Sequence, residues 1–167
     1  DVNNNIGHSS PVITVGDTIV VGSLVFDFPT RNSNPPGHVR GYDVRSGELK
    51  WRFHSIPQEG EPFNETWEND AWKTVGNTNV WSMMSADTEL GYVYLPFGTP
   101  TNDYYGGHRH GDNVYAESLV CLDAKTGERV WHFQIIHHGL WDWDFPTAPT
   151  LMDLEVEGRS IKALAQV

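Results

Sequence analysis

The sequence predicts an all-β protein built from tandem antiparallel sheets, because it contains a strand repeat, matching turn residues and almost no helix signals. Gly41–Phe53 and Cys121–Phe133 align without a gap, 80 positions apart, with Asp, Gly, Glu, Trp and Phe at equivalent places. Gly47 and Gly127 can take the positive φ that a tight hairpin turn needs. Each copy is therefore expected to form a strand, a turn and a second strand.

A second repeated element precedes each hairpin. Ser10–Gly22 and Val80–Leu95 each have the pattern of a strand, a turn and a strand, and Ala148–Leu164 begins a third copy. The chain is thus expected to hold two four-stranded units and the start of a third. Their approximate bounds are residues 8–54, 79–134 and 147–167, the last being incomplete.

Four-stranded antiparallel units in tandem, rich in Gly and aromatic residues, favour blades of a β-propeller. A β-sandwich and a β-solenoid are the alternatives. Long polar insertions, Thr30–His38, Pro57–Asn79 and Thr99–Glu117, separate the predicted strands. In propellers such loops usually build the functional face, so these insertions are where chemistry is expected.

Composition excludes some classes of partner. The 167 residues are 38% hydrophobic and carry a formal net charge of −11, which opposes binding to nucleic-acid phosphates and to anionic lipid surfaces. Apolar runs such as Leu24–Phe26 are far shorter than the roughly 18 residues of a membrane span. The single cysteine, Cys121, lies in an apolar run and is expected to be a small buried hydrophobe. The chain begins at Asp1 without Met and stops inside an apolar stretch, so we expect both ends to be cuts in a longer parent.

The segment His137–Pro146 concentrates reactive side chains. It holds two imidazoles, two indoles and two carboxylates in ten residues, a set that is costly to bury without a function. The alternative is that Asp142 and Asp144 cap turns while Trp141 and Trp143 pack between blades. His137 and His138 are expected to scaffold the loop, since adjacent strand residues point to opposite faces and chelate zinc poorly. A zinc hydrolase would also need a chelate such as His-x-x-x-His, which the sequence lacks.

These patterns resemble those of the pyrroloquinoline quinone (PQQ) dependent dehydrogenases. The Asp-x-x-(Ser/Thr)-Gly-x-x-x-Trp hairpins resemble the family's docking motif, in which Trp51 and Trp131 would lock one blade to the next. His137–Pro146 resembles the His-His-x-Leu-Trp-Asp-x-Asp-x-Pro segment of the membrane glucose dehydrogenase branch, which makes Asp142 the implied catalytic base. The docking motif also occurs in non-enzymatic propellers.

The resemblance also implies residues for the cofactor and a metal. Asn77–Ser82 is similar to the stretch whose tryptophan, here Trp81, lies beneath the quinone; the alternative is a core tryptophan on a strand. Gly98–Arg109 resembles the loop that reaches toward calcium, with Thr101 as the matching ligand and Asn102 as a competing one. Asp27 approximately matches an acidic calcium ligand, and the alternative is a loop carboxylate without a metal.

The implied parent is an eight-bladed quinoprotein that uses PQQ and Ca²⁺ to oxidise a CH–OH group of a sugar, polyol or alcohol by hydride transfer. Ubiquinone or a cytochrome would be the onward electron acceptor. The implied location is the periplasm or the periplasmic face of the inner membrane, with membrane association possible through regions outside this chain. The isolated chain is expected to be inactive. The alternative is a non-catalytic propeller scaffold of the outer-membrane assembly lipoprotein type.

Overall fold

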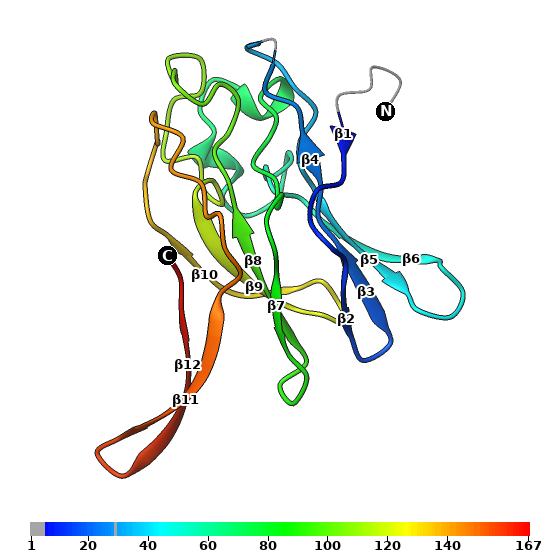
Figure 1. Cartoon of the computed structure of the whole chain (residues 1–167). Helices are drawn as coiled ribbons and strands as arrows, with labels where there is room; N and C mark the ends of the chain where they lie inside the picture. The colour runs from blue at the N-terminus through cyan, green and yellow to red at the C-terminus, as the bar shows by residue number, and fades with distance from the viewer. Residues whose placement is uncertain (1–5, 29) are drawn as a thin grey trace.

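The computed structural model describes residues 6–28 and 30–167 and consists mainly of antiparallel strands (Figure 1). Their bounds are β1 Ile6–Gly7, β2 Ile13–Val15, β3 Thr18–Val21, β4 Leu24–Val25, β5 Val39–Asp43, β6 Leu49–Phe53, β7 Ser85–Asp87, β8 Tyr92–Phe97, β9 Ser118–Asp123, β10 Arg129–Gln134, β11 Thr150–Val156 and β12 Arg159–Ala165. Two short 3-10 helices, η1 (Asn64–Thr66) and η2 (Ala71–Lys73), lie in one long loop.

Two four-stranded sheets and one two-stranded sheet follow the predicted repeat. The first sheet has the order β2-β3-β5-β6, the second β7-β8-β9-β10, and β11 pairs with β12. In both repeated hairpins one aspartate closes the turn: Asp43 Oδ1 accepts the N–H groups of Arg45 and Ser46, and Asp123 Oδ1 does the same 80 positions later. The all-β, tandem-sheet prediction is confirmed, whereas the exact division into blades stays a prediction.

The main core lies between the two four-stranded sheets. Fully buried side chains of the inner strands meet there, among them Val20, Val39, Val93, Leu95, Val120 and Leu122. Trp51 crosses from the first sheet and donates from Nε1 to the carbonyl of Ala124 at 3.0 Å. Its indole packs on the next hairpin so closely that a Cβ at Gly127 would lie 2.5 Å from the ring. Trp51 therefore docks one sheet on the next, as predicted.

A second apolar cluster joins the second sheet to β11 and β12. Tyr94, Leu119 and Cys121 contact Phe145, with Trp131, Leu151 and Leu164 packed around them. Cys121 is fully buried and free, and burial raises the pKa of its thiol to about 12. Its predicted role as a buried hydrophobe is confirmed.

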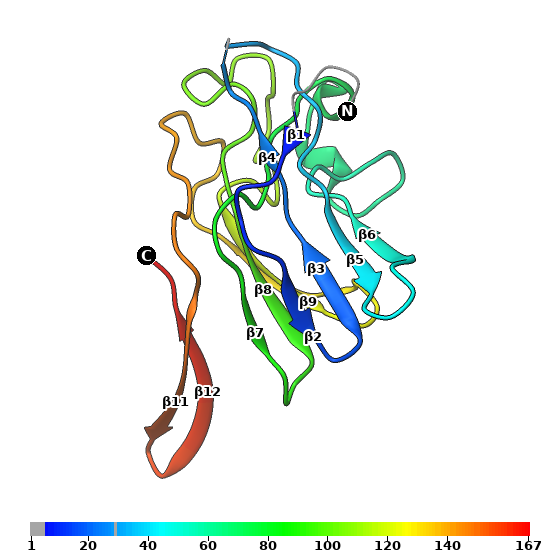
Figure 2. The same ribbon diagram turned by 45° about the vertical axis from the view of Figure 1, so that its right-hand side comes forward.

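The long polar loops gather at one end of the sheets, opposite most of the tight hairpin turns (Figures 1 and 2). The loop between β6 and β7 has a small core of its own, in which Trp67 packs with Ile56, Ala71 and Val75. Trp67 also donates from Nε1 to the carbonyl of Val114, which ties this loop to the neighbouring one. No helix within the described ranges is long and apolar enough to cross a membrane.

Two expectations about local structure were wrong. The strand predicted to begin at Val80 begins at Ser85, because the carbonyls of Val80 and Trp81 bind Ser23 N–H and Ser9 Oγ instead of a strand partner. His137 and His138 lie in a turn after β10, not on a strand.

Candidate functional site

The loop end holds a cavity of about 280 Å³. Two strand residues, Leu24 and Val25, form part of its wall, and loop residues supply the rest. These loop residues are Asp27, Asn77, Asn79, Trp81, Thr99, Asp103, Asp142 and Asp144. The cavity therefore collects residues from four loops that are far apart in the sequence, including three of the four predicted site residues.

Trp81 forms part of the cavity wall outside any strand. The side chain is half-buried, and its Nε1 donates to Asp144 Oδ2 at 2.5 Å. This hydrogen bond fixes the indole plane relative to the cavity. The alternative of a core tryptophan on a strand is wrong, since Trp81 precedes β7 and lines the cavity.

Asp144 anchors the end of the His137–Phe145 loop. Its Oδ1 accepts the backbone N–H of Thr99 at 2.5 Å, while Oδ2 accepts the Trp81 indole. A Cβ at Gly98 would lie 2.5 Å from the same carboxylate, so only glycine leaves room for it there. Burial raises the pKa of Asp144, and the hydrogen bond from Thr99 partly offsets this effect.

Asp142 projects from the exposed part of that loop into the cavity lining. Its backbone has φ of 53°, and its Oδ2 accepts a hydrogen bond from the Tyr104 hydroxyl at 3.2 Å. Trp141 and Trp143, on either side, are 75% and 63% exposed. In this chain the two indoles therefore do not pack between sheets, contrary to the alternative considered for this segment.

Asp27 and Thr101 are linked by hydrogen bonds to a third side chain, that of Asn77. Asn77 Nδ2 donates to Asp27 Oδ1, and Asn77 Oδ1 accepts from Thr101 Oγ1 at 2.6 Å. Asn34 Nδ2 donates to the same Asn77 oxygen at 3.0 Å. The competing residue, Asn102, instead accepts the N–H of Tyr104 on its side-chain oxygen.

Asn77 was missed as a site residue by sequence reasoning. The signal available was its position at the start of Asn77–Ser82, with a second amide, Asn79, two residues later. Asp103 and Asp144, which line the cavity, and Tyr104, which binds Asp142, were also missed, because nothing local distinguishes such loop residues from those that only face solvent.

The cavity is strongly acidic. Four aspartates line it, and none of its lining residues is Lys or Arg. The pKa of Asp103 is raised to about 7 because its carboxyl is partly buried and faces Asp27, Asp142 and Asp144. Burial raises the pKa of Asp27 as well, with a further contribution from Asp142. Carboxylates crowded in this way favour a bound cation.

The donors near Asp27 fit a hard cation such as Ca²⁺. In the part of the chain that the structure describes, no three His, Cys, Asp or Glu side chains are grouped to hold a metal. A metal here would therefore need amide and hydroxyl oxygens besides carboxylate, which Ca²⁺ accepts. Asn34 is only 8% exposed and its Oδ1 has no hydrogen-bond partner, an orphaned oxygen beside Asp27 and Thr101. The residues present fit the ion.

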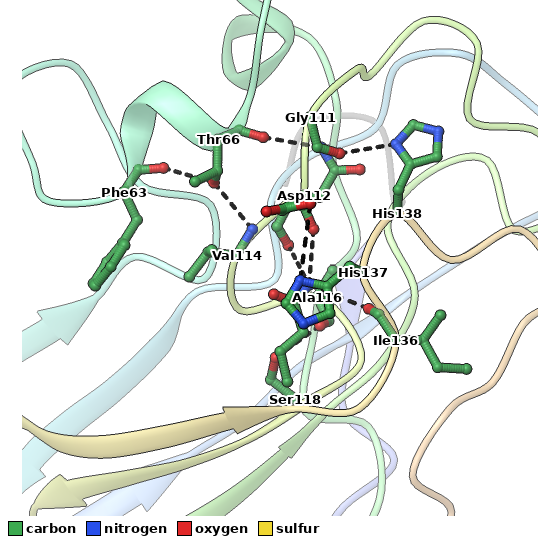
Figure 3. Close-up of polar contacts among 12 residues, drawn as sticks. Phe63, Thr66, Gly111, Asp112, Val114, Ala116, Ser118, Ile136, His137 and His138 are labelled. Carbon is green, nitrogen blue, oxygen red and sulfur yellow. Dashed lines mark hydrogen bonds and ion pairs between the residues drawn. The ribbon is translucent and has the colours of Figure 1, made fainter.

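The two histidines hold the loop through the 110–112 segment. His138 Nδ1 contacts the Gly111 carbonyl at 2.9 Å, and His137 Nδ1 lies 3.9 Å from Asp112 Oδ1 (Figure 3). The hydrogen-bonding role predicted for this pair agrees with the His138 contact, whereas His137 is only within ion-pair distance of Asp112, and the strand geometry used for the prediction was wrong.

The fold and the site together define a repeated-sheet, propeller-type protein with an acidic, tryptophan-walled cavity at its loop end. Residues 1–167 match the family model described as "PQQ: Glucose/ethanol/alcohol dehydrogenase, beta-propeller domain". The chain belongs to this family of PQQ-dependent dehydrogenase propellers. The match covers every residue and therefore favours the dehydrogenase family over the non-catalytic scaffold.

Relatives agree with this assignment. The chain is 38% identical to the quinoprotein glucose dehydrogenase of Escherichia coli over 93% of its own length and 19% of that protein. It is 37% identical to the quinate/shikimate dehydrogenase (quinone) of Acinetobacter baylyi over 92% of its length and 18% of that protein. A quinohemoprotein alcohol dehydrogenase structure from Pseudomonas putida superposes with a TM-score of 0.81 at 27% identity, covering 95% of this chain and 24% of that one. The chain thus spans about a fifth of the length of these curated relatives.

Proposed function

We propose that this chain supplies part of the active site of a PQQ- and calcium-dependent dehydrogenase that oxidises a CH–OH group of a sugar, polyol or alcohol. The observation that carries the proposal is the cavity itself, where Trp81, four aspartates and the Asp27–Asn77–Thr101 cluster converge. The relatives named for glucose and for quinate or shikimate support a hydroxylated substrate.

Each residue has a separate task in this proposal. Trp81 offers an aromatic face for a planar cofactor, and its bond to Asp144 keeps that face in place. Asp27, Asn77 and Thr101 would hold Ca²⁺ through oxygen atoms. When bound, PQQ would supply the hydride acceptor and Ca²⁺ would supply a Lewis acid. Asp142 accepts the substrate hydroxyl proton as a general base, with Tyr104 orienting its carboxylate.

The wider setting is also proposed from the family. Electrons leave through ubiquinone or a cytochrome, and the protein works in the periplasm or on the periplasmic face of the inner membrane.

The test is a PQQ titration of the full-length protein, with and without Ca²⁺, followed by reduction of an artificial electron acceptor. Replacing Trp81 with Ala removes the stacking face, a loss of about 1–1.5 kcal/mol beyond area burial, so the Kd for PQQ should rise roughly tenfold or more. Trp72→Ala is the matched control, because Trp72 is half-buried in η2 and does not line the cavity. An unchanged Kd for Trp81→Ala, or no PQQ-dependent turnover in the parent, would contradict the proposal.

A further inference from the structure

The segment that carries Asp142 is anchored on one side by a buried contact and on the other by partly buried contacts. Before it, the carbonyl of Gly139 accepts Arg109 Nη2 at 2.6 Å; after it, Asp144 binds Trp81 and Thr99. Between the two anchors lie only residues 140–143, and all four are exposed. The direction of the Asp142 carboxylate therefore depends on how firmly each anchor is fixed.

Arg109, which forms the first anchor, is 0% exposed, and full burial is rare for an arginine. Its Nη1 donates to Asn113 Oδ1 at 2.8 Å, and Nη2 reaches both the Gly139 and the Asn102 carbonyls. Burial lowers its pKa to about 10, while Glu117 and Asp103 favour the charged form, so the guanidinium remains charged at neutral pH. Burying a charge costs free energy unless hydrogen bonds compensate for it. Here the compensating hydrogen bonds go to backbone carbonyls of two loops, so the charge joins these loops.

Glu117 packs against the same anchor, Gly139. It is also 0% exposed, and its carboxyl occupies the space where a Cβ at residue 139 would lie. Its Oε1 accepts from Thr99 Oγ1 at 3.3 Å, and the N–H of Thr99 binds Asp144. Glu117 thus lies against the Gly139 anchor and is linked to the Asp144 anchor through Thr99.

The chain between Arg109 and Glu117 also supports the start of the loop. His138 contacts the Gly111 carbonyl, and the backbone N–H of His138 donates to the carbonyl of Asp112 (Figure 3). The anchor at Gly139 is therefore accompanied by further hydrogen bonds at the start of the loop and is not an isolated contact.

We propose that Arg109 is a positioning residue for the oxidation: by binding the Gly139 carbonyl, its guanidinium fixes the backbone that aims Asp142 into the cavity. Arg109 lines neither the cavity nor the Asp27–Asn77–Thr101 cluster, and its shorter carbonyl contact, 2.6 Å to Gly139 against 3.4 Å to Asn102, is the one to the segment that carries Asp142. This inference rests on the proposed function, because it assigns Asp142 the proton-accepting role.

The experiment uses the full-length protein with Arg109→Ala and Arg109→Lys, and with Arg45→Ala and Arg45→Lys as controls at an exposed hairpin-turn arginine. Four quantities are measured: kcat and KM, the Kd for PQQ, the Tm, and deuterium uptake of backbone amides in residues 139–143. Arg109→Ala is also assayed with added guanidinium, which can enter the space that the side chain leaves.

We expect Arg109→Ala to lower kcat by roughly 100-fold, a loss that a 1 Å misplacement of a catalytic group can cause, while KM and the Kd for PQQ stay unchanged. Arg109→Lys should lower kcat roughly tenfold, because an ammonium cannot reproduce the fork of a guanidinium. Guanidinium should restore part of the kcat of Arg109→Ala, and deuterium uptake in residues 139–143 should rise in both variants. The Arg45 variants should match the parent.

Parental kcat and parental deuterium uptake in Arg109→Lys would overturn the proposal. So would a joint loss of kcat and PQQ affinity in Arg109→Ala that guanidinium does not restore, since that result marks a general structural role. If Arg109→Ala does not fold, Arg109→Lys decides by the same measurements. If the parent itself lacks PQQ-dependent activity, the proposed function fails, and the deuterium uptake of residues 139–143 still decides whether Arg109 fixes this segment.

Discussion

At the scale of single residues, Asp142 and Asp144 have the same side chain two positions apart but different surroundings. Asp144 is half-buried and binds two N–H groups, whereas Asp142 is exposed and binds only the Tyr104 hydroxyl among the described residues. Each Asp144 oxygen is occupied by an N–H donor, whereas the exposed Asp142 carboxylate keeps an oxygen free to meet a substrate hydroxyl. This contrast supports Asp142 as the base and Asp144 as an anchor.

Replacing Asp142 with Asn in the full-length protein tests this assignment. The amide keeps the size of the side chain but cannot accept the hydroxyl proton, so turnover should fall by about 10²–10⁴-fold while the Kd for PQQ is unchanged. Steady-state rates at saturating PQQ and Ca²⁺ measure the loss. Retention of more than about a tenth of the parental rate would lie outside the range for general-base catalysis and would exclude this role.

Asp70→Asn is the appropriate control for that substitution. Asp70 is exposed and has φ of 59°, close to the 53° of Asp142, and it lies outside the cavity. Asp144→Asn would be unsuitable, because it would disturb the bonds to Trp81 and Thr99.

At the scale of elements, one indole joins two sheets. Trp51 on β6 packs on the hairpin between β9 and β10 and donates to the Ala124 carbonyl within it. The hairpin can approach the ring so closely because Gly127 has no Cβ and takes φ of 76°. The turn at Gly127 therefore has two roles: it reverses the chain between β9 and β10, and it provides the surface on which Trp51 of the neighbouring sheet packs.

Gly127→Ala should separate these purposes when compared with Gly91→Ala. Both glycines have positive φ, 76° and 72°, so both variants carry about 1–2 kcal/mol of backbone strain. Only at Gly127 would the new methyl also meet Trp51, which adds about 1–3 kcal/mol for overpacking. Thermal unfolding of the two full-length variants should show the lower Tm for Gly127→Ala. Equal Tm values would mean that the contact with Trp51 contributes little to stability.

At the scale of the whole molecule, the net charge of −11 includes a concentration of carboxylates at the loop end. The pKa of Asp103 is about 7 in the folded protein against 3.8 for an ordinary aspartate, so the folded state binds its proton more tightly than the unfolded state does. Stability from this group is therefore lost as the pH rises from about 4 through about 7. A cation in the cavity would offset the repulsion that causes the loss.

Calcium should consequently stabilise the metal-free full-length protein more at pH 8 than at pH 5. At about 100 times its Kd, a ligand contributes about 2.7 kcal/mol, which would appear as a higher Tm at pH 8. At pH 5 protonation of Asp103 competes with the ion, and the increase in Tm should be smaller. The Asp103→Asn variant should lose most of this pH dependence. The absence of a calcium-dependent Tm at both pH values would argue against a metal in this cavity.

The sequence by itself determined the features that depend on local chemistry. Turn glycines, aspartates that cap their own hairpins and an 80-residue repeat predict the sheets, since these interactions join residues close in the chain. Trp81 and Asp142 could also be predicted as site residues, because each lies in a segment that resembles a known motif. Their catalytic and cofactor roles stay predictions.

Only the tertiary structure decided which side chains share the cavity. Asn77 reaches Asp27 across 50 positions, and Trp81 reaches Asp144 across 63. Arg109 became significant only when its guanidinium was found buried against the Gly139 carbonyl, 30 positions away. Contacts of this kind arise when packed sheets bring distant loops to one end, and no local pattern of residues encodes which loops will meet.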